Sequence, residues 1–278
     1  MKSYSYPSVL TIAGFDGSGG AGIQADIKTF SALGCYATSV LTALPVQNTT
    51  GVKSIYPIPA EAVAEQIRTV LEDIPAGAIK IGMVHSSELV DIIAHELSSY
   101  KSTPIVFDPV MVASSGHKLI KDETIQSIVS KLFPLSTIIT PNLDEASVLS
   151  GKTISSVDDM YSAGEAIMKL GPGSVLLKGG HLKSDKLTSL YFTPDGTIVE
   201  YHFDRYDTNN THGSGCTLSS AIAAYIARGY SNRDAVAAGQ DYVQQAILHG
   251  SDVLTGKGNG PLNHFFNPHK MIKHALVG

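Results

Sequence analysis

The stretch SVLTIAGFDGSGGAGIQADIKTFSAL, residues 8–33, joins a short apolar run to a glycine-rich turn and then to a helical pattern. Residues 8–14 are nearly all apolar and predict a buried strand, whereas residues 23–33 predict a helix. A strand, a tight turn and a helix in that order form the first half of a βαβ unit, which places parallel strands in one sheet. This stretch therefore indicates an α/β fold.

The turn Gly17-Ser18-Gly19-Gly20-Ala21-Gly22 matches the GxGxxG pattern of dinucleotide-binding proteins. That motif expects an acidic residue about 20 positions further on, to hold the ribose. No Asp or Glu occurs between Asp26 and Glu61, so a dinucleotide site is rejected. Two interpretations stay open: the turn lets the backbone approach a ligand, or it only tightens the connection between strand and helix.

Strand and helix patterns continue to alternate along the chain. Strands are predicted at residues 36–44, 78–83, 104–107, 137–140 and 174–177, and helices at residues 61–74, 87–100, 122–133, 217–228 and 234–248. This rhythm predicts parallel strands with right-handed crossovers and helices on both faces of the sheet. Residues 189–203 break it and predict an antiparallel hairpin, while residues 256–268 predict a surface loop.

Composition limits the class of protein. The chain has 278 residues, 43% of them hydrophobic, with a net charge of −5 and no run of basic residues. A large core is therefore expected, and a nucleic-acid or membrane-surface partner is not. No apolar run approaches the roughly 18 residues of a spanning helix, and no signal peptide is recognised. Cys35 and Cys216 lie far apart with no CxxC motif, so we expect free thiols in the cytoplasm. Without a composition break or repeat, residues 1–278 are expected to form one domain.

The segment THGSGCT, residues 211–217, joins a second glycine turn to the start of a helix. Unpaired N–H groups and the positive end of the helix dipole should converge on residues 213–216, where a phosphoryl group could be held. A helix N-terminus should lower the pKa of the Cys216 thiol from its free value of about 8.5, giving an acid or base closer to neutrality. The alternative is a small buried residue that only packs.

Three further polar side chains are expected where strands end, which is where open α/β sheets bind ligands. Gln47 could read the edge of a heterocycle, or its amide could be satisfied by nearby backbone. Asp108 follows the predicted strand at residues 104–107 and could bind a ligand or metal, or cap the loop. Lys178 follows the strand at residues 174–177 and could meet a phosphate as a point charge.

Asn142 and Glu145 stand three residues apart at the start of a short predicted helix, so their side chains share one face. Oxygen ligands at this spacing suit Mg²⁺, which keeps several waters and uses one or two carboxylates with substrate phosphate. The alternative is a capping box with Glu145 at its third position.

Four segments in order carry a resemblance to a known family: TIAGFDGSGGAGIQAD (residues 11–26), TPNLDE (140–145), KGGH (178–181) and THGSGCT (211–217). Together they resemble the hydroxymethylpyrimidine/phosphomethylpyrimidine kinases of thiamine biosynthesis, within the ribokinase-like superfamily. The resemblance implies a three-layer α/β/α fold with a mostly parallel central sheet. It also implies phosphorylation, with ATP and Mg²⁺, of 4-amino-5-hydroxymethyl-2-methylpyrimidine and then of its monophosphate.

The resemblance assigns roles to individual positions. The pyrimidine pocket corresponds to Gly14, Asp26, Gln47, Met83 and Val110. Cys216 stands at the position of the catalytic base, in a loop with Gly213 and Gly215. Asp108 and Glu145 match the magnesium region, and Asn142, Lys178 and Thr211 match the nucleotide side. Pro45, beside Gln47, departs from the smaller apolar residue usual there, which affects the shape of the pocket.

Two alternatives remain. A pyridoxal kinase or a bifunctional vitamin kinase shares the cysteine and much of the glycine architecture. A nucleotide-binding regulatory protein on the same fold would lack transfer activity, but it has no physical reason to keep Cys216, Asp108, Glu145 and Lys178 together. The expected partners are small-molecule substrates, and the expected assembly is a homodimer.

Overall fold

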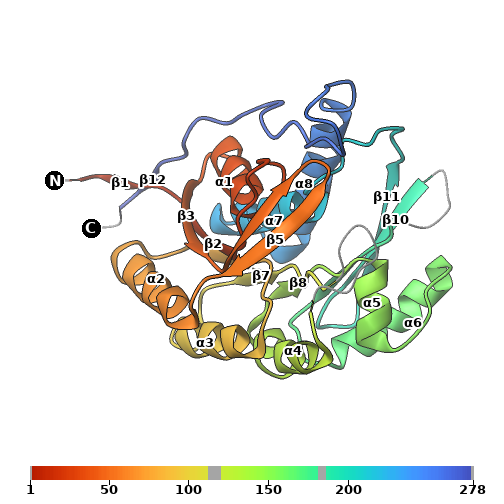
Figure 1. Cartoon of the computed structure of the whole chain (residues 1–278), viewed down its shortest axis with the longest axis horizontal. Coiled ribbons are helices and arrows are strands. Elements are labelled where there is room, and N and C mark those ends of the chain that lie inside the picture. Colours follow the sequence, from red (N-terminus) through yellow and green to blue (C-terminus); the bar gives the residue numbers. More distant parts are fainter. Residues whose placement is uncertain (1, 112–119, 181–185, 277–278) are drawn as a thin grey trace.

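The computed structural model describes residues 2–111, 120–180 and 186–276, and an eight-stranded sheet forms its middle layer (Figure 1). The strands of this sheet are β2 (Ser8–Ala13), β3 (Tyr36–Leu41), β6 (Ala78–Ile81), β7 (Ile105–Phe107), β8 (Ile138–Ile139), β9 (Val175–Lys178), β10 (Lys186–Phe192) and β11 (Ile198–Asp204). Their spatial order is β11-β10-β9-β8-β7-β6-β2-β3. The six neighbouring strands β9-β8-β7-β6-β2-β3 pair parallel. Strand β10 pairs antiparallel with both of its neighbours, β9 and β11. The predicted mostly parallel sheet is therefore confirmed.

Helices cover both faces of the sheet. One layer contains α1 (Gly22–Ala32), α7 (Ser214–Ala227) and α8 (Asn232–Leu248). The other contains α2 (Ala60–Asp73), α3 (Ser87–Leu97), α4 (Asp122–Ser127), α5 (Leu143–Ser150) and α6 (Val157–Met168). After α4 the chain continues in a π-helical turn (Ile128–Leu132) and a 3-10 turn (Phe133–Leu135). The three-layer α/β/α architecture is thus confirmed.

The strands are apolar because both faces of the sheet are covered. All six residues of β2 are buried, as expected for a parallel strand between two helical layers. The one charged side chain in β6 is Lys80, which is also fully buried. Among the described residues, no helix combines the length and apolar character needed to cross a membrane.

The order of the strands fixes where a ligand can bind. From β2 the chain passes through α1 to β3 on one side, and it later returns to β6 on the other side of β2. Such a reversal opens a crevice at the carboxyl ends of β2 and β6. The segments that follow β2 and β6 meet there, beside the carboxyl ends of β7, β8 and β9.

The predicted strand at residues 36–44 is wrong at its end. β3 stops at Leu41. Thr42 gives the last bond of the ladder to the carbonyl of Ala13, and its hydroxyl turns to the carbonyl of Met83. The chain then forms β4 (Ala43–Asn48), which pairs antiparallel with β5 (Gly51–Pro57) in a separate two-stranded hairpin (Figure 1). Gln47 therefore lies in this hairpin and not in a loop at the end of a sheet strand.

Near the termini, β1 (Tyr4–Ser5) pairs antiparallel with β12 (His274–Ala275). This short ladder holds the first and last described segments side by side (Figure 1).

Candidate active site

The start of α7 is built to leave backbone N–H groups free. Gly213 precedes the helix in the left-handed region, with φ 82°, and a Cβ there would lie 1.8 Å from the carbonyl oxygen of Gly20, so only glycine fits. Ser214 donates its N–H to Thr211, and Thr217 donates to Gly213. Within the described residues, the amides of Gly215 and Cys216 have no acceptor. Two donors and the positive end of the helix dipole are thus available to an anion.

Asp108 and Lys178 face this helix start. Asp108 is buried at the end of β7, and its Oδ1 accepts hydrogen bonds from Thr140 Oγ1 (3.0 Å) and Lys178 Nζ (3.0 Å). A Cβ on Gly215 would lie 3.4 Å from both Asp108 Oδ2 and Lys178 Nζ. The structure therefore brings together Asp108, Lys178 and Gly215, which are separated by up to 107 positions in the sequence.

Asn142 and Glu145 form the capping box that was the alternative to a magnesium site. Asn142 Oδ1 accepts from the Glu145 N–H (2.9 Å), and Glu145 Oε2 accepts from the Asn142 N–H (2.8 Å). Burial raises the pKa of Glu145 to about 7, although the positive charge of Lys178 opposes this rise. No cluster of three His, Cys, Asp or Glu side chains that could hold a metal occurs in the described part of the chain.

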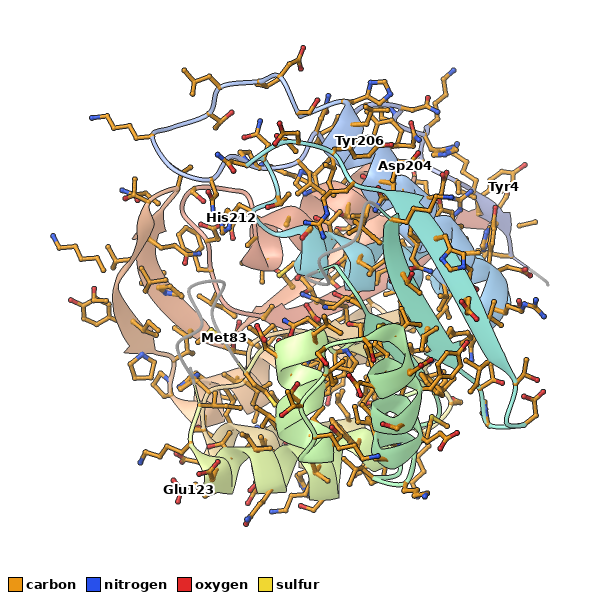
Figure 2. The ribbon with its side chains drawn as sticks, turned by 90° about the vertical axis from the view of Figure 1, so that its right-hand side faces the viewer. Tyr4, Met83, Glu123, Asp204, Tyr206 and His212 are labelled. Atoms are coloured by element: carbon orange, nitrogen blue, oxygen red, sulfur yellow. The ribbon has the colours of Figure 1, made fainter. Side chains whose placement is uncertain are left out.

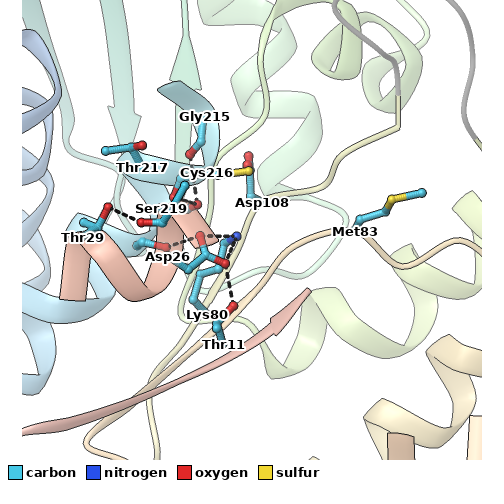
Figure 3. A network of polar contacts seen from close by, with 12 residues as sticks. Thr11, Asp26, Thr29, Lys80, Met83, Asp108, Gly215, Cys216, Thr217 and Ser219 are labelled. Atoms are coloured by element: carbon cyan, nitrogen blue, oxygen red, sulfur yellow. Dashed lines mark hydrogen bonds and ion pairs between the residues drawn. The ribbon is translucent and has the colours of Figure 1, made fainter. Parts of the chain in front are cut away.

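Cys216 lies in the first turn of α7, close to Asp108 and Lys80 (Figure 3). The backbone N–H of Gly22, the first residue of α1, favours the thiolate form of the Cys216 sulfur. Burial nevertheless raises the pKa of the thiol to about 11, while the nearby ammonium of Lys80 lowers it. The expectation of a lowered pKa is therefore wrong for the free protein, because loss of hydration disfavours the thiolate more than its neighbours stabilise it.

Asp26 and Lys80 form a fully buried ion pair beneath Cys216 (Figure 3). Lys80 Nζ lies 2.9 Å from each Asp26 oxygen, and Thr11 and Ser220 each donate a hydroxyl to the same carboxylate at 2.6 Å. Thr11 and Lys80 are partners on the adjacent strands β2 and β6. The hydrogen bonds of the Asp26 carboxylate are thus made to other protein side chains. A residue of the pyrimidine pocket was expected to face the substrate instead.

The remaining pocket candidates border the crevice between β2 and β6. The space that a side chain on Gly14 would fill lies 3.7 Å from Met83 Sδ and 3.9 Å from Pro45 Cδ. Figure 2 shows Met83 in the segment after β6 and His212 in the connection that leads to α7. Val110 is half-buried two residues beyond Asp108, to whose carbonyl it donates.

Gln47 is half-buried in β4, and its carbonyl lies near Gly17. Within the described residues, its side-chain amide has no hydrogen-bond partner in the protein. The amide is therefore available to a ligand. Thr211 is exposed and contributes its carbonyl to Ser214, and His181 of the KGGH segment lies outside the described residues.

Cavity size alone does not mark this site. A cavity of about 840 Å³ is lined by residues 85–88 and 120–124, and another of about 470 Å³ lies between α7, α8 and residues 266–269. Neither is lined by Cys216, Asp108 or Lys178. Free amides and converging charges identify the candidate site instead.

Sequence reasoning missed four side chains that support this site: Lys80, Ser220, Asp16 and His212. The signal for Lys80 was a lysine inside an apolar strand pattern, since a buried lysine requires a partner. The signal for His212 was its place inside the glycine segment before α7. Neither signal shows the residue with which each side chain pairs, Asp26 for Lys80 and Asp16 for His212.

The strand order, the reversal at β2 and the amide-lined start of α7 place this chain in the ribokinase-like class of kinases. Two solved structures share the fold. One is phosphomethylpyrimidine kinase from Clostridium difficile 630, 44% identical with a TM-score of 0.77, covering 86% of this chain and 99% of that one. The other is an ADP complex of Bacillus subtilis pyridoxal kinase, 34% identical with a TM-score of 0.86, covering 94% and 98%.

Residues 16–263 match the family model described as phosphomethylpyrimidine kinase, and the chain belongs to that family. A curated relative from Rhizobium meliloti, named hydroxymethylpyrimidine/phosphomethylpyrimidine kinase, is 45% identical over 257 residues, which are 92% of this chain and 96% of the relative. The chain spans about half the length of three longer relatives that are named as thiamine biosynthesis bifunctional enzymes or proteins. The resemblance found in the sequence is thereby confirmed.

Proposed function

We propose that the protein transfers phosphoryl groups from ATP to 4-amino-5-hydroxymethyl-2-methylpyrimidine and then to its monophosphate. The observation that carries this proposal is the convergence of the free amides of α7 with Asp108, Lys178 and Cys216 at one sheet edge. Phosphoryl transfer requires positioning of the reactants, stabilisation of charge and a group that takes the hydroxyl proton. The names of the relatives support the choice of acceptor.

Each group has a role in this proposal. The free amides of Gly215 and Cys216 would hold the transferred phosphoryl group, and Lys178 would contact a phosphate oxygen. Cys216 would accept the proton of the substrate hydroxyl. Asn142 and Thr211 would lie on the nucleotide side. The pair formed by Lys80 and Asp26 would support Cys216 from below.

The donors around Asp108 fit a magnesium ion held with the nucleotide. Asp108 uses Oδ1 for protein contacts, and its Oδ2 faces Gly215 at the anion site. Mg²⁺ commonly keeps waters and binds one or two carboxylates plus substrate phosphate, so a complete protein cage is unnecessary. When bound, the ion would supply positive charge to the phosphates, and Asp108 and Glu145 would hold it directly or through water.

Replacing Glu145 by Gln is expected to raise the Mg²⁺ concentration required for half-maximal activity and to lower turnover. Glutamine can still accept from the Asn142 N–H, so the cap of α5 survives while the negative charge is lost. Magnesium titrations of the initial rate measure the effect. Asp144→Asn, an exposed neighbour in the same helical turn, is the control. An unchanged magnesium requirement in Glu145→Gln would remove Glu145 from the metal site.

Gln47 supports the aminopyrimidine as acceptor over pyridoxal. Its free amide offers one acceptor and two donors, which can pair with a ring nitrogen and an exocyclic amine. Pyridoxal has no equivalent amine, so part of the buried amide would lose its partner at a cost of about 1–3 kcal/mol. Release of ADP should therefore be faster with hydroxymethylpyrimidine than with pyridoxal, and ribose should give none. A coupled ADP-release assay on the three compounds tests the proposed function.

We expect Gln47→Leu to reduce kcat/KM for hydroxymethylpyrimidine more than for pyridoxal, so that the preference between them shrinks. In the parent, kcat/KM for hydroxymethylpyrimidine should exceed that for pyridoxal by a factor of roughly five to more than a hundred, as the loss of a partner for the amide implies. Gln126→Leu makes the same chemical change on the exposed face of α4 and should alter neither substrate. Equal efficiency in the parent, or an equal loss on both substrates, would favour the bifunctional vitamin kinase.

A further inference from the structure

The carboxylate of Asp16 is a junction between two distant glycine turns. It is fully buried, and its Oδ1 accepts from the N–H and hydroxyl of Ser18 at 2.9 and 2.7 Å. Its Oδ2 accepts from the N–H groups of Gly20 (3.1 Å) and Ala21 (2.7 Å), and it lies 2.9 Å from His212 Nε2. Although burial opposes ionisation, the hydrogen bonds from His212 and the turn hold the pKa of Asp16 well below its usual range.

The two turns also touch through their backbones. A Cβ on Gly20 would lie 2.5 Å from the ring of His212, and a Cβ on Gly213 would lie 1.8 Å from the carbonyl oxygen of Gly20. On its other side, His212 donates its N–H to Gly260. The imidazole of His212 therefore links the loop before α7, to which it belongs, to the turn after β2, where its Nε2 meets the carboxylate of Asp16.

This junction reaches the catalytic cysteine in two steps. The Asp16 carboxylate fixes the amides of Gly20 and Ala21, and Gly22 follows directly as the first residue of α1. A Cβ on Gly22 would lie 2.3 Å from the carbonyl oxygen of Gly14, so the two backbones are in close contact and leave no room for a side chain. On the other side, a Cβ on Gly213 would lie 3.0 Å from the Cα of Ala21, so the start of α1 packs against the start of α7, in which Cys216 stands four residues after His212.

We propose that Asp16 and His212 act together as a clasp that holds the start of α1 against the start of α7, and so positions Cys216 for turnover. Neither residue touches the reacting atoms, so both are positioning residues. The clasp lies next to Gly14 and Thr211 as well, but it holds the amide-lined start of α7 most directly, so its loss should lower kcat by a much larger factor than it raises KM. The inference rests on the proposed function for its kinetic readout.

A double-mutant cycle tests the pair. His212→Ala and Asp16→Asn should each lower kcat by roughly 10–100-fold, the scale of a small misplacement of a catalytic group, with both KM values changed less than about three-fold. Because the residues act as one unit, the double variant should lose no more than the worse single variant. His212→Gln keeps an N–H donor of similar reach and should restore most of the turnover. His202→Ala, which removes an exposed histidine beside Glu200 on β11, is the control and should match the parent.

Hydrogen exchange gives a readout that does not depend on the substrate. In the free protein, residues 16–24 and 211–217 should exchange faster in both single variants, and residues 198–204 of β11 should not. If the parent fails to phosphorylate the pyrimidine, the proposed function fails while the exchange result still decides the clasp. Parent-like turnover in His212→Ala, multiplied losses in the double variant, unchanged exchange, or a Gln variant as impaired as the Ala variant would each overturn the inference.

Discussion

Replacing Cys216 by alanine is expected to lower kcat by about 100-fold or more, the usual scale for loss of general-base catalysis. Alanine favours the helix and keeps the free amides of Gly215 and Cys216 in place, so binding of ATP and of the pyrimidine should persist. Steady-state kinetics and calorimetric binding measure the two effects separately. Cys35→Ala, at a buried thiol bonded to the carbonyl of Ala224, is the control and should keep the parent kcat.

The general-base role of Cys216 also predicts the direction in which the activity of the parent enzyme changes with pH. Burial raises the pKa of Cys216 to about 11, so the thiol is protonated at neutral pH and its reactive thiolate increases as pH rises. We therefore expect kcat/KM to climb from pH 7 to pH 9, and the residual activity of the alanine variant to stay flat. Iodoacetamide should modify Cys216 before Cys35, whose pKa burial raises to about 12. Parent-rate turnover by the alanine variant would reduce the thiol to a packing role.

Lys80→Met is expected to lower the free energy of unfolding by about 3–5 kcal/mol, because it leaves the buried carboxylate of Asp26 without its counterion. Thr11 and Ser220 would still donate to that carboxylate, but neutral hydroxyls do not balance its charge. The melting temperature should fall by roughly 10 °C. Urea titration followed by circular dichroism measures the free energy directly.

Two controls separate the ion pair from simple packing. Lys131→Met removes an exposed ion pair with Asp91 and should cost less than about 1 kcal/mol. In the double variant Lys80→Met/Asp26→Asn no uncompensated charge remains, so part of the lost stability should return. A double variant as unstable as Lys80→Met, or one that is worse, would show that the cost comes from packing and not from an unpaired charge.

Most of the fold could be predicted because burial on both faces leaves a simple pattern in the sequence. The strand at residues 8–14 and the helix at residues 61–74 appear within a residue or two of β2 and α2. The β4–β5 hairpin was missed because the apolar run continues past Thr42, and only a tertiary hydrogen bond from the Thr42 hydroxyl to Met83 marks the place where the chain leaves the main sheet. Helix α6 was also missed, although Ser156 and Asp159 form a capping box at its start.

The site could be predicted where it depends on strand ends and not where it depends on side-chain pairs. Asp108 and Lys178 meet because parallel strands end at one edge. The partner of Asp26 lies 54 positions away in Lys80, and no pattern along one element shows that pairing. The acidity of Cys216 was predicted with the wrong sign for the same reason, since the packing that raises the pKa of the thiol comes from distant segments.

The long separation between these partners has a consequence for when the site forms. Asp16 pairs with a residue 196 positions later, and Asp26 bonds to Ser220 across 194 positions. Closing such long loops is slow, and contacts of this range form after local helices and neighbouring strands. During synthesis both aspartates emerge long before their last partners, which are His212 in the connection before α7 and Ser220 in α7 itself. The molecule can therefore hold most of its secondary structure while its catalytic edge is still open, and catalytic competence is acquired only when the penultimate helix docks.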